Sequence, residues 1–228
     1  MASRELTPGH DPSGSHRPPL LGVVLAGGRS SRMGVDKATL PGDRSSPNYL
    51  AQATSRLASL VDRVGVSGRS EAELLHWPGL SKGTIAIPDS RVWDGPAIGV
   101  EASLRVAHRL GLAGVLVTPV DMPDLDATEL RKLIEAWERE PGTIVASFGA
   151  DRPEPLVALY PITLLDELAE LIETPHRSLF RFLCERPTIR VELPKSAARN
   201  INRPEDLLDP SGSEPTRSDE GTESPSQL

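Results

Sequence analysis

The hydrophobic positions of this chain form short continuous runs that alternate with stretches of helical spacing. Residues 20–25 are almost entirely apolar, which predicts a buried strand. Residues 49–61 carry apolar side chains three and four positions apart, as in an amphipathic helix that covers a sheet. Residues 114–118 form the most hydrophobic run, so we expect this strand at the centre of the sheet.

The remaining elements follow the same two patterns, except that residues 189–193 alternate between apolar and polar side chains, as a half-buried strand does. Further strands are expected at residues 64–66, 84–87, 143–147, 156–160 and 189–193. Helices are expected at residues 71–75, 97–110, 126–138, 162–173, 178–184 and 200–207. Because strands and helices alternate, the sequence predicts an α/β fold with three layers, in which a mostly parallel sheet is covered by helices on both faces.

A glycine-rich, basic segment follows the first strand directly. Residues 25–37 read Leu-Ala-Gly-Gly-Arg-Ser-Ser-Arg-Met-Gly-Val-Asp-Lys. Glycines let backbone N–H groups approach phosphate oxygens, and Arg29, Arg32 and Lys37 add positive charge. The spacing matches neither the P-loop nor the dinucleotide fingerprint. The segment therefore predicts a phosphate site of another kind.

Asp121 is the best candidate for a metal ligand. It follows the most hydrophobic strand in the sequence Pro-Val-Asp-Met-Pro at residues 119–123, where the flanking prolines hold an extended backbone. Mg²⁺ commonly takes only one or two protein carboxylates and completes its shell with phosphate oxygens and waters. The alternative is an ordinary turn aspartate that bonds its own backbone. The nearby basic segment favours the metal.

Other polar or glycine-containing segments also follow predicted strands. Ser67 ends the second strand, Asp89 follows the third, and an Asp-Gly-Pro turn at residues 94–96 opens a helix. Asp89 could accept two hydrogen bonds from guanine, or it could simply terminate a strand. Since ligands of parallel sheets bind beyond the carboxyl ends of the strands, we expect these groups to line one crevice with Asp121.

Composition limits the domain organisation. The chain has 228 residues, which suits one large domain. We expect a disordered leader at residues 1–19, the folded domain at residues 20–208, and an acidic disordered tail at residues 209–228. The tail carries a net charge of −4 and the leader none, so the domain keeps −3 of the total −7. This near-neutral domain lacks the excess of basic residues that is typical of nucleic-acid-binding proteins.

Cys184 is the single cysteine of the chain, so an intrachain disulfide framework and a cysteine-cluster zinc site are excluded. We expect it in the core, and we expect a reducing, cytoplasmic location. No apolar run is long enough to cross a membrane, so we expect no membrane partner.

Five motifs together resemble those of the MobA-type molybdenum cofactor guanylyltransferases. They are residues 25–37, Gly-Pro at 95–96, Val-Asp-Met-Pro at 120–123, Pro-Glu-Pro-Leu at 153–156 and Asn-Ile-Asn-Arg-Pro-Glu-Asp-Leu at 200–207. The resemblance covers about residues 21–208 and implies a Rossmann-like nucleotidyltransferase fold. The adjacent glycines at 27–28, the Asp-Lys pair at 36–37 and the Asn-x-Asn segment favour the guanylyl branch over the cytidylyl branch.

The resemblance implies an enzyme that transfers GMP from GTP to the terminal phosphate of molybdopterin, or of its molybdenum-loaded form, and releases pyrophosphate. Mg²⁺ is the implied cofactor, and transient contact with molybdenum-insertion or acceptor enzymes is implied as well. The implied GTP-binding residues are Leu25, Ala26, Gly27, Gly28, Lys37, Ser67, Asp89 and Asp121. Lys37, Arg32 and Asp121 are the implied catalytic residues, with Asp121 also on the metal. Asn200 and Asn202 belong to the pterin side.

The sequence departs from the family pattern at three places. Residues 41–48 replace a short Gly-Lys-Pro-Leu turn, which removes a basic residue that Arg44 could replace. Ser67 stands where asparagine is usual, and Arg203 where threonine is usual.

Three alternatives follow from the residues. The nearest is the same fold acting on CTP or on another acceptor. The second is a nucleotide-binding module without turnover, which the intact Lys37 and Asp121 disfavour. The third is a dinucleotide-dependent oxidoreductase, disfavoured because Gly-x-Gly-x-x-Gly is absent.

Overall fold

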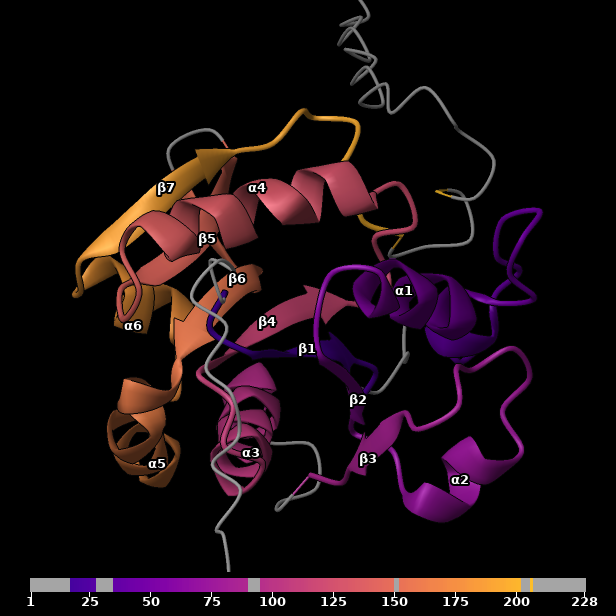
Figure 1. Ribbon diagram of the computed structural model, residues 1–228, viewed down its shortest axis with the longest axis horizontal. Coiled ribbons are helices and arrows are strands. Elements are labelled where there is room, and N and C mark those ends of the chain that lie inside the picture. The colour runs from indigo at the N-terminus through magenta and orange to yellow at the C-terminus, as the bar shows by residue number, and fades with distance from the viewer. Residues whose placement is uncertain (1–16, 28–34, 90–94, 150–151, 202–205, 207–228) are drawn as a thin grey trace, which may run out of the picture.

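A computed structural model describes residues 17–27, 35–89, 95–149, 152–201 and 206 of the chain. Within these residues a seven-stranded sheet runs in the order β3-β2-β1-β4-β6-β5-β7, with helices packed on both of its faces (Figure 1). The strands are β1 (Leu20–Leu25), β2 (Arg63–Ser67), β3 (Ile85–Ile87), β4 (Gly114–Pro119), β5 (Ile144–Gly149), β6 (Arg152–Pro161) and β7 (Thr188–Glu192).

The strand directions confirm the expected mostly parallel sheet. β1 is parallel to β2 and β4, β2 to β3, and β5 to β7. β6 is antiparallel to both of its neighbours, β4 and β5. This reversal follows from the short connection between β5 and β6, which is long enough for a hairpin but not for a parallel crossover. β4 is the fourth strand of the seven, so its predicted central place is confirmed.

The α-helices of the described residues are α1 (Tyr49–Ala58), α2 (Glu71–Leu75), α3 (Pro96–Arg109), α4 (Ala127–Arg139), α5 (Leu165–Glu173) and α6 (Leu179–Cys184). Two 3₁₀ turns, η1 (Lys37–Thr39) and η2 (Ile162–Leu164), accompany them. No described helix has the length and apolar character that a membrane span requires.

The alternation of side chains along the strands creates two hydrophobic cores. Leu20 and Val24 of β1 point into a core that α1 and α4 cover, whereas Leu21 and Val23 point into a core covered by α3, α5 and α6. Figure 1 shows α1 and α4 above the sheet, with α3 and α5 below it. The predicted three-layer arrangement is confirmed.

The structure corrects several predicted bounds. The strand expected at 156–160 begins earlier, at Arg152, because it pairs with β5 along the hairpin. The helix expected at 162–173 starts with the 3₁₀ turn η2. Cys184 is exposed rather than in the core, because α6 turns Leu179, Phe182 and Leu183 inward instead. The helix expected at 200–207 lies mostly outside the described residues.

Candidate active site

The carboxyl ends of the central strands meet at one edge of the sheet. Leu25, the last residue of β1, is in register with Ser67 of β2 on one side and with Pro119 of β4 on the other. Ser67 is in turn paired with Ile87, the last residue of β3. The segments that follow these strands therefore leave the sheet side by side.

Four predicted residues form a base-side cluster at this edge: Ala26, Gly27, Ser67 and Asp89. The Ala26 N–H donates to the Ser67 carbonyl at 3.0 Å, and the Ser67 hydroxyl donates to Asp89 Oδ1 at 3.3 Å. Gly27 lies so close that a Cβ on it would stand 2.9 Å from Asp89 Oδ2. The first turns of α3 close the cluster, since a Cβ on Gly99 would meet the Ser67 hydroxyl at 2.6 Å.

The carboxyl group of Asp89 is in an environment that does not favour its charge. Partial burial raises the pKa of Asp89, and the hydrogen bond from Ser67 only partly offsets this effect. A ligand that donates N–H groups to this carboxylate would restore the lost solvation. The cluster therefore suits a base with adjacent donors.

Lys37 and Asp121 form a second group at the same edge. The Lys37 ammonium donates to Asp121 Oδ2 at 2.7 Å, and the two side chains are 16% and 22% exposed. Lys37 opens η1, which Asp36 caps by accepting the Ala38 N–H at 3.0 Å. The two predicted catalytic residues are thus brought together from positions 84 residues apart.

The backbone around Asp121 is held from two directions. The Val120 N–H donates to the Leu25 carbonyl at 3.2 Å, and the Ile201 N–H donates to the Asp121 carbonyl at 2.9 Å. The second bond places the segment that contains Asn200 beside Asp121. Asn200 itself is exposed.

Two polar residues of α1 fix the loop after Asp121, and sequence reasoning missed both. Arg56 donates to the carbonyls of Met122 at 3.2 Å and Pro123 at 3.1 Å, and also to that of Leu125. Gln52 donates to the Pro123 carbonyl at 3.1 Å. Burial lowers the pKa of Arg56 to about 10. No pattern in the sequence singles them out, because their partners are backbone carbonyls about 70 residues further along the chain.

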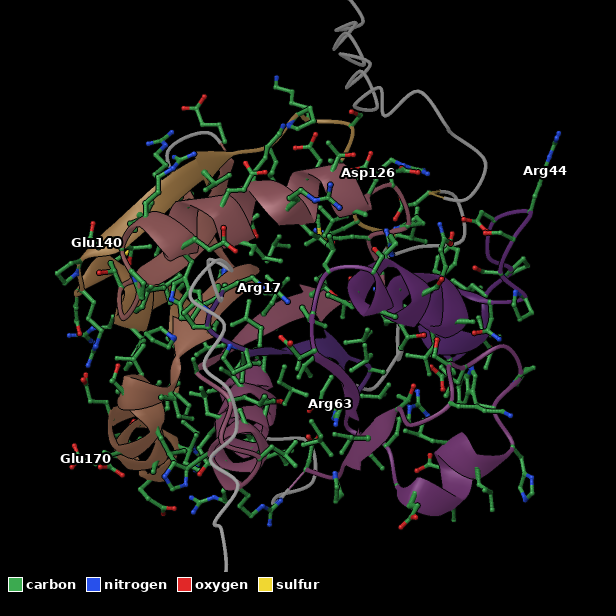
Figure 2. The ribbon with its side chains drawn as sticks, viewed as in Figure 1. Arg17, Arg44, Arg63, Asp126, Glu140 and Glu170 are labelled. Carbon is green, nitrogen blue, oxygen red and sulfur yellow. The ribbon has the colours of Figure 1, made fainter. Side chains whose placement is uncertain are left out.

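The segment at residues 41–48, which departs from the family pattern, is a compact turn. Asn48 caps α1 by accepting the Ala51 N–H at 2.9 Å, and it also accepts the Trp77 indole N–H at 3.0 Å. Arg44 is exposed, and Figure 2 shows its side chain projecting away from the molecule. This orientation gives no support to Arg44 as a replacement for the missing basic residue.

Eight of the predicted site residues are described, and all lie at or beside this edge: Leu25, Ala26, Gly27, Lys37, Ser67, Asp89, Asp121 and Asn200. Gly28, Arg32 and Asn202 lie outside the described residues, as do Arg29 and Arg203.

The described residues contain no group of three or more histidines, cysteines and acids that could hold a metal ion by themselves. Asp121 is instead a single carboxylate in contact with Lys37. This donor set fits a Mg²⁺ ion that arrives with nucleotide phosphates, because such an ion takes only one or two protein carboxylates.

A mostly parallel sheet with a basic glycine-rich segment after β1 and a carboxylate after β4 defines a nucleotide-binding α/β protein. The family model described as "MobA-like NTP transferase domain" matches residues 22–189. The chain belongs to this family.

Curated relatives align with this chain over nearly their whole length. A protein of Rhodopirellula baltica named "Probable molybdenum cofactor guanylyltransferase" is 42% identical over 196 residues, which cover 85% of this chain and 92% of the relative. The "Molybdenum cofactor guanylyltransferase" of Rhizobium leguminosarum is 33% identical over 204 residues, which cover 85% of this chain and 92% of that protein.

Solved structures share the fold. Molybdopterin-guanine dinucleotide biosynthesis protein A from Archaeoglobus fulgidus has a TM-score of 0.63 at 21% identity, with 82% of this chain and 95% of that chain covered. Rv0371c from Mycobacterium tuberculosis has a TM-score of 0.65 at 21% identity, with 85% and 97% covered. Rv0371c has also been solved as a complex with manganese, with a TM-score of 0.56 at 22% identity and 78% and 89% covered.

Proposed function

We propose that this protein transfers GMP from GTP to the terminal phosphate of molybdopterin and releases pyrophosphate. The names of its relatives support this activity. The observation that carries it is the Lys37–Asp121 pair, which stands at the same sheet edge as the Ser67–Asp89 contact. The Lys37–Asp121 pair suits the triphosphate of a nucleotide, and the Ser67–Asp89 contact suits its base. A nucleoside triphosphate needs both.

The base-side cluster would recognise guanine. Asp89 would accept the N1–H and the 2-amino N–H of the base, and the Ser67 hydroxyl would hold the carboxylate in place. Leu25, Ala26, Gly27 and Gly28 would contribute backbone contacts. A carboxylate that reads two adjacent donors discriminates strongly, because an unmatched base leaves it desolvated and unpaired.

The transfer of the nucleotidyl group depends on charge neutralisation and needs no general base. A phosphate monoester is already mostly ionised at neutral pH, so an acceptor oxygen attacks the α-phosphorus without prior proton removal. The new bond joins that oxygen to the α-phosphorus, and the bond from the α-phosphorus to the bridging oxygen breaks. Lys37 and Arg32 would stabilise the pyrophosphate that leaves.

Asp121 would hold the Mg²⁺ ion, which supplies charge neutralisation and alignment of the phosphates when it is bound. The manganese complex of Rv0371c is a precedent for a divalent metal on this fold. Arg56 and Gln52 act on the same group indirectly, because they hold the loop that follows Asp121.

The acceptor would bind on the side of residues 200–202, where the Ile201 N–H contacts the Asp121 carbonyl. Asn200 and Asn202 are the proposed contacts. We include in this proposal a transient contact with molybdenum-insertion or acceptor enzymes and a cytoplasmic location, in which the exposed Cys184 thiol would stay reduced.

The test is an incubation of the protein with molybdopterin, Mg²⁺ and each nucleoside triphosphate in turn, scored by pyrophosphate release. Release that depends on GTP supports the proposal. Release with CTP alone points to the cytidylyl reaction, and nucleotide binding without release points to a module without turnover.

A further inference from the structure

Arg69 is an arginine outside the motifs, yet it contacts the end of the basic segment. Its guanidinium forms an ion pair with the Asp36 carboxylate, lies 3.5 Å from Glu73 Oε1, and stands 5.3 Å from the centre of the Trp77 ring. Only 14% of the side chain is exposed. Contacts on three sides therefore fix its position, and we refer to the Arg69–Asp36 ion pair as the clasp.

The clasp completes a two-point attachment of residues 27–36. At the start of this segment, Gly27 packs against Gly68, so closely that a Cβ on Gly68 would lie 2.1 Å from the Gly27 Cα. At its end, Asp36 is held by Arg69. Two consecutive residues after β2 thus hold both ends of the segment that follows β1.

The carboxylate in the clasp also controls the position of Lys37. Asp36 caps η1 through the Ala38 N–H at 3.0 Å, and Lys37 is the first residue of that turn. If Asp36 moves, the turn moves with it, and so does the ammonium group that contacts Asp121.

Charge gives the clasp a second role. Asp36 is an acid immediately before the lysine that would meet the triphosphate, so an uncompensated carboxylate there would repel the ligand. Arg69 is the cation that pairs with it. An arginine suits this task because its planar guanidinium pairs with two carboxylates and stacks on an indole ring at the same time.

We propose that Arg69 is a positioning residue of the phosphate site, which neutralises Asp36 and holds η1 so that Lys37 meets the triphosphate. The proposal rests on the proposed function for the identity of the ligand, but the attachment of η1 does not depend on it.

The test uses four variants of the full-length chain: Arg69→Gln, Asp36→Asn, the double variant, and Glu73→Gln. Asparagine at 36 keeps the helix cap but removes the charge. Glu73→Gln removes the other carboxylate beside Arg69, and a glutamine can keep the capping box that this position forms with Ser70, so the variant tests the more distant of the two carboxylates separately. Two readouts are measured: the Kd of Mg–GTP, and amide hydrogen exchange across residues 36–40. Thermal unfolding shows that each variant is folded.

Arg69→Gln should weaken Mg–GTP binding by about 10- to 100-fold, as expected for displaced phosphate contacts, and should speed exchange at residues 36–40. Added salt should recover part of its affinity, because salt screens the repulsion from Asp36. Asp36→Asn and the double variant should bind within about threefold of each other, less tightly than the wild type because both lose the clasp, but more tightly than Arg69→Gln because neither leaves an unpaired carboxylate. Glu73→Gln should change both readouts much less than Arg69→Gln does, because the ion pair with Asp36 and the stacking on Trp77 remain.

An Arg69→Gln variant with wild-type affinity and wild-type exchange overturns the clasp. So does a double variant that is as weak as Arg69→Gln, because charge compensation is then not the cause. If the wild type binds no GTP, the proposed function fails separately. The exchange data then decide the clasp alone: faster exchange in Arg69→Gln supports it, and unchanged exchange overturns it.

Discussion

At the scale of single residues, the site is held together by charged side chains whose partners lie far away in the sequence, as in the contacts of Lys37 with Asp121 and of Arg69 with Asp36. Lys37, Asp89 and Asp121 could be selected because each follows a predicted strand and carries a charge that a nucleotide site needs. Arg56 and Arg69 could not, because their importance comes from what they touch: three loop carbonyls in one case and an acid 33 residues away in the other. An arginine in a sequence does not reveal its partner.

The Lys37–Asp121 pair leads to a first prediction. Lys37→Ala and Asp121→Ala should each lower kcat/KM for GTP by about 10²–10³, the loss typical of a removed electrostatic contact in an active site. Lys132→Ala is the control, because its contact with Glu129 is also 2.7 Å long but lies on α4, with the lysine side chain 45% exposed. Steady-state pyrophosphate release measures all three. Turnover near the wild-type rate in either site variant would remove that residue from the mechanism.

Asp89 leads to a second prediction, on pH and base choice. Guanine needs the ionised carboxylate, so KM for GTP should rise as pH falls through the pKa of Asp89, which burial raises from its ordinary value. Asp89→Asn should lose this pH dependence and weaken GTP binding by about 10- to 100-fold, the worth of hydrogen bonds to a charged group. It should also lose the preference for GTP over ITP, which lacks the 2-amino group.

The same raised pKa has a consequence for stability. Folding favours the protonated form of Asp89, so its contribution is present at low pH and is lost as pH rises through the raised pKa. Asp89→Asn should therefore melt at a slightly higher temperature than the wild type at neutral pH. For the prediction on base choice, an Asp89→Asn variant that still prefers GTP to ITP would contradict the role of Asp89 in base recognition.

At the scale of elements, the sequence predicted each of the seven strands in the described chain: apolar runs indicated the buried strands, and alternation indicated β7, which is only partly buried. The direction of β6 was not predicted, since hydrophobicity carries no information on direction. The close approach of the segments after β1 and β2 could not be predicted from the sequence either, because it depends on Gly27 and Gly68 meeting in space.

A third prediction isolates this close approach. Gly68 and Gly83 have the same φ of 83°, but a Cβ on Gly68 would collide with the Gly27 backbone, whereas one on Gly83 would meet nothing within 4 Å. Gly83→Ala should cost about 1–2 kcal/mol for the left-handed backbone alone. Gly68→Ala should cost about 1–3 kcal/mol more because of overpacking. Urea unfolding measures the free energy of unfolding of both variants. Equal losses would show that the segments after β1 and β2 move apart without cost and would contradict the close approach of Gly27 and Gly68.

At the scale of the whole molecule, composition predicts a folded domain at residues 20–208. Arg17 belongs to the leader expected at residues 1–19, and it is among the described residues. Arg17 pairs with Asp62 at 3.1 Å, and the same carboxylate accepts the Leu20 N–H at 2.8 Å. A side chain from the expected leader therefore contacts the connection between α1 and β2.

A fourth prediction concerns the two ends of the chain. A protein of residues 17–208 should match the full chain within about 0.5 kcal/mol of unfolding free energy, with the same kcat/KM. A protein of residues 20–208 should lose up to about 1 kcal/mol more, the worth of an exposed ion pair. Urea unfolding and pyrophosphate release measure both. A lower kcat/KM after removal of residues 209–228 would assign the acidic tail a part in turnover.

The register of β2, β1 and β4 has one further consequence. Ser67, Leu25 and Pro119 lie in one row across three adjacent strands. Neighbouring strands are about 4.8 Å apart, so the two outer residues stand about 10 Å from each other. The hydrogen bonds of the sheet fix this interval between the groups that would hold the base and those that would hold the phosphates. If these groups bind the nucleotide as proposed, the fixed spacing would select ligands by the distance between base and phosphates, and a GTP analogue with a longer or shorter linker in place of the ribose should have a higher Kd although its base is guanine.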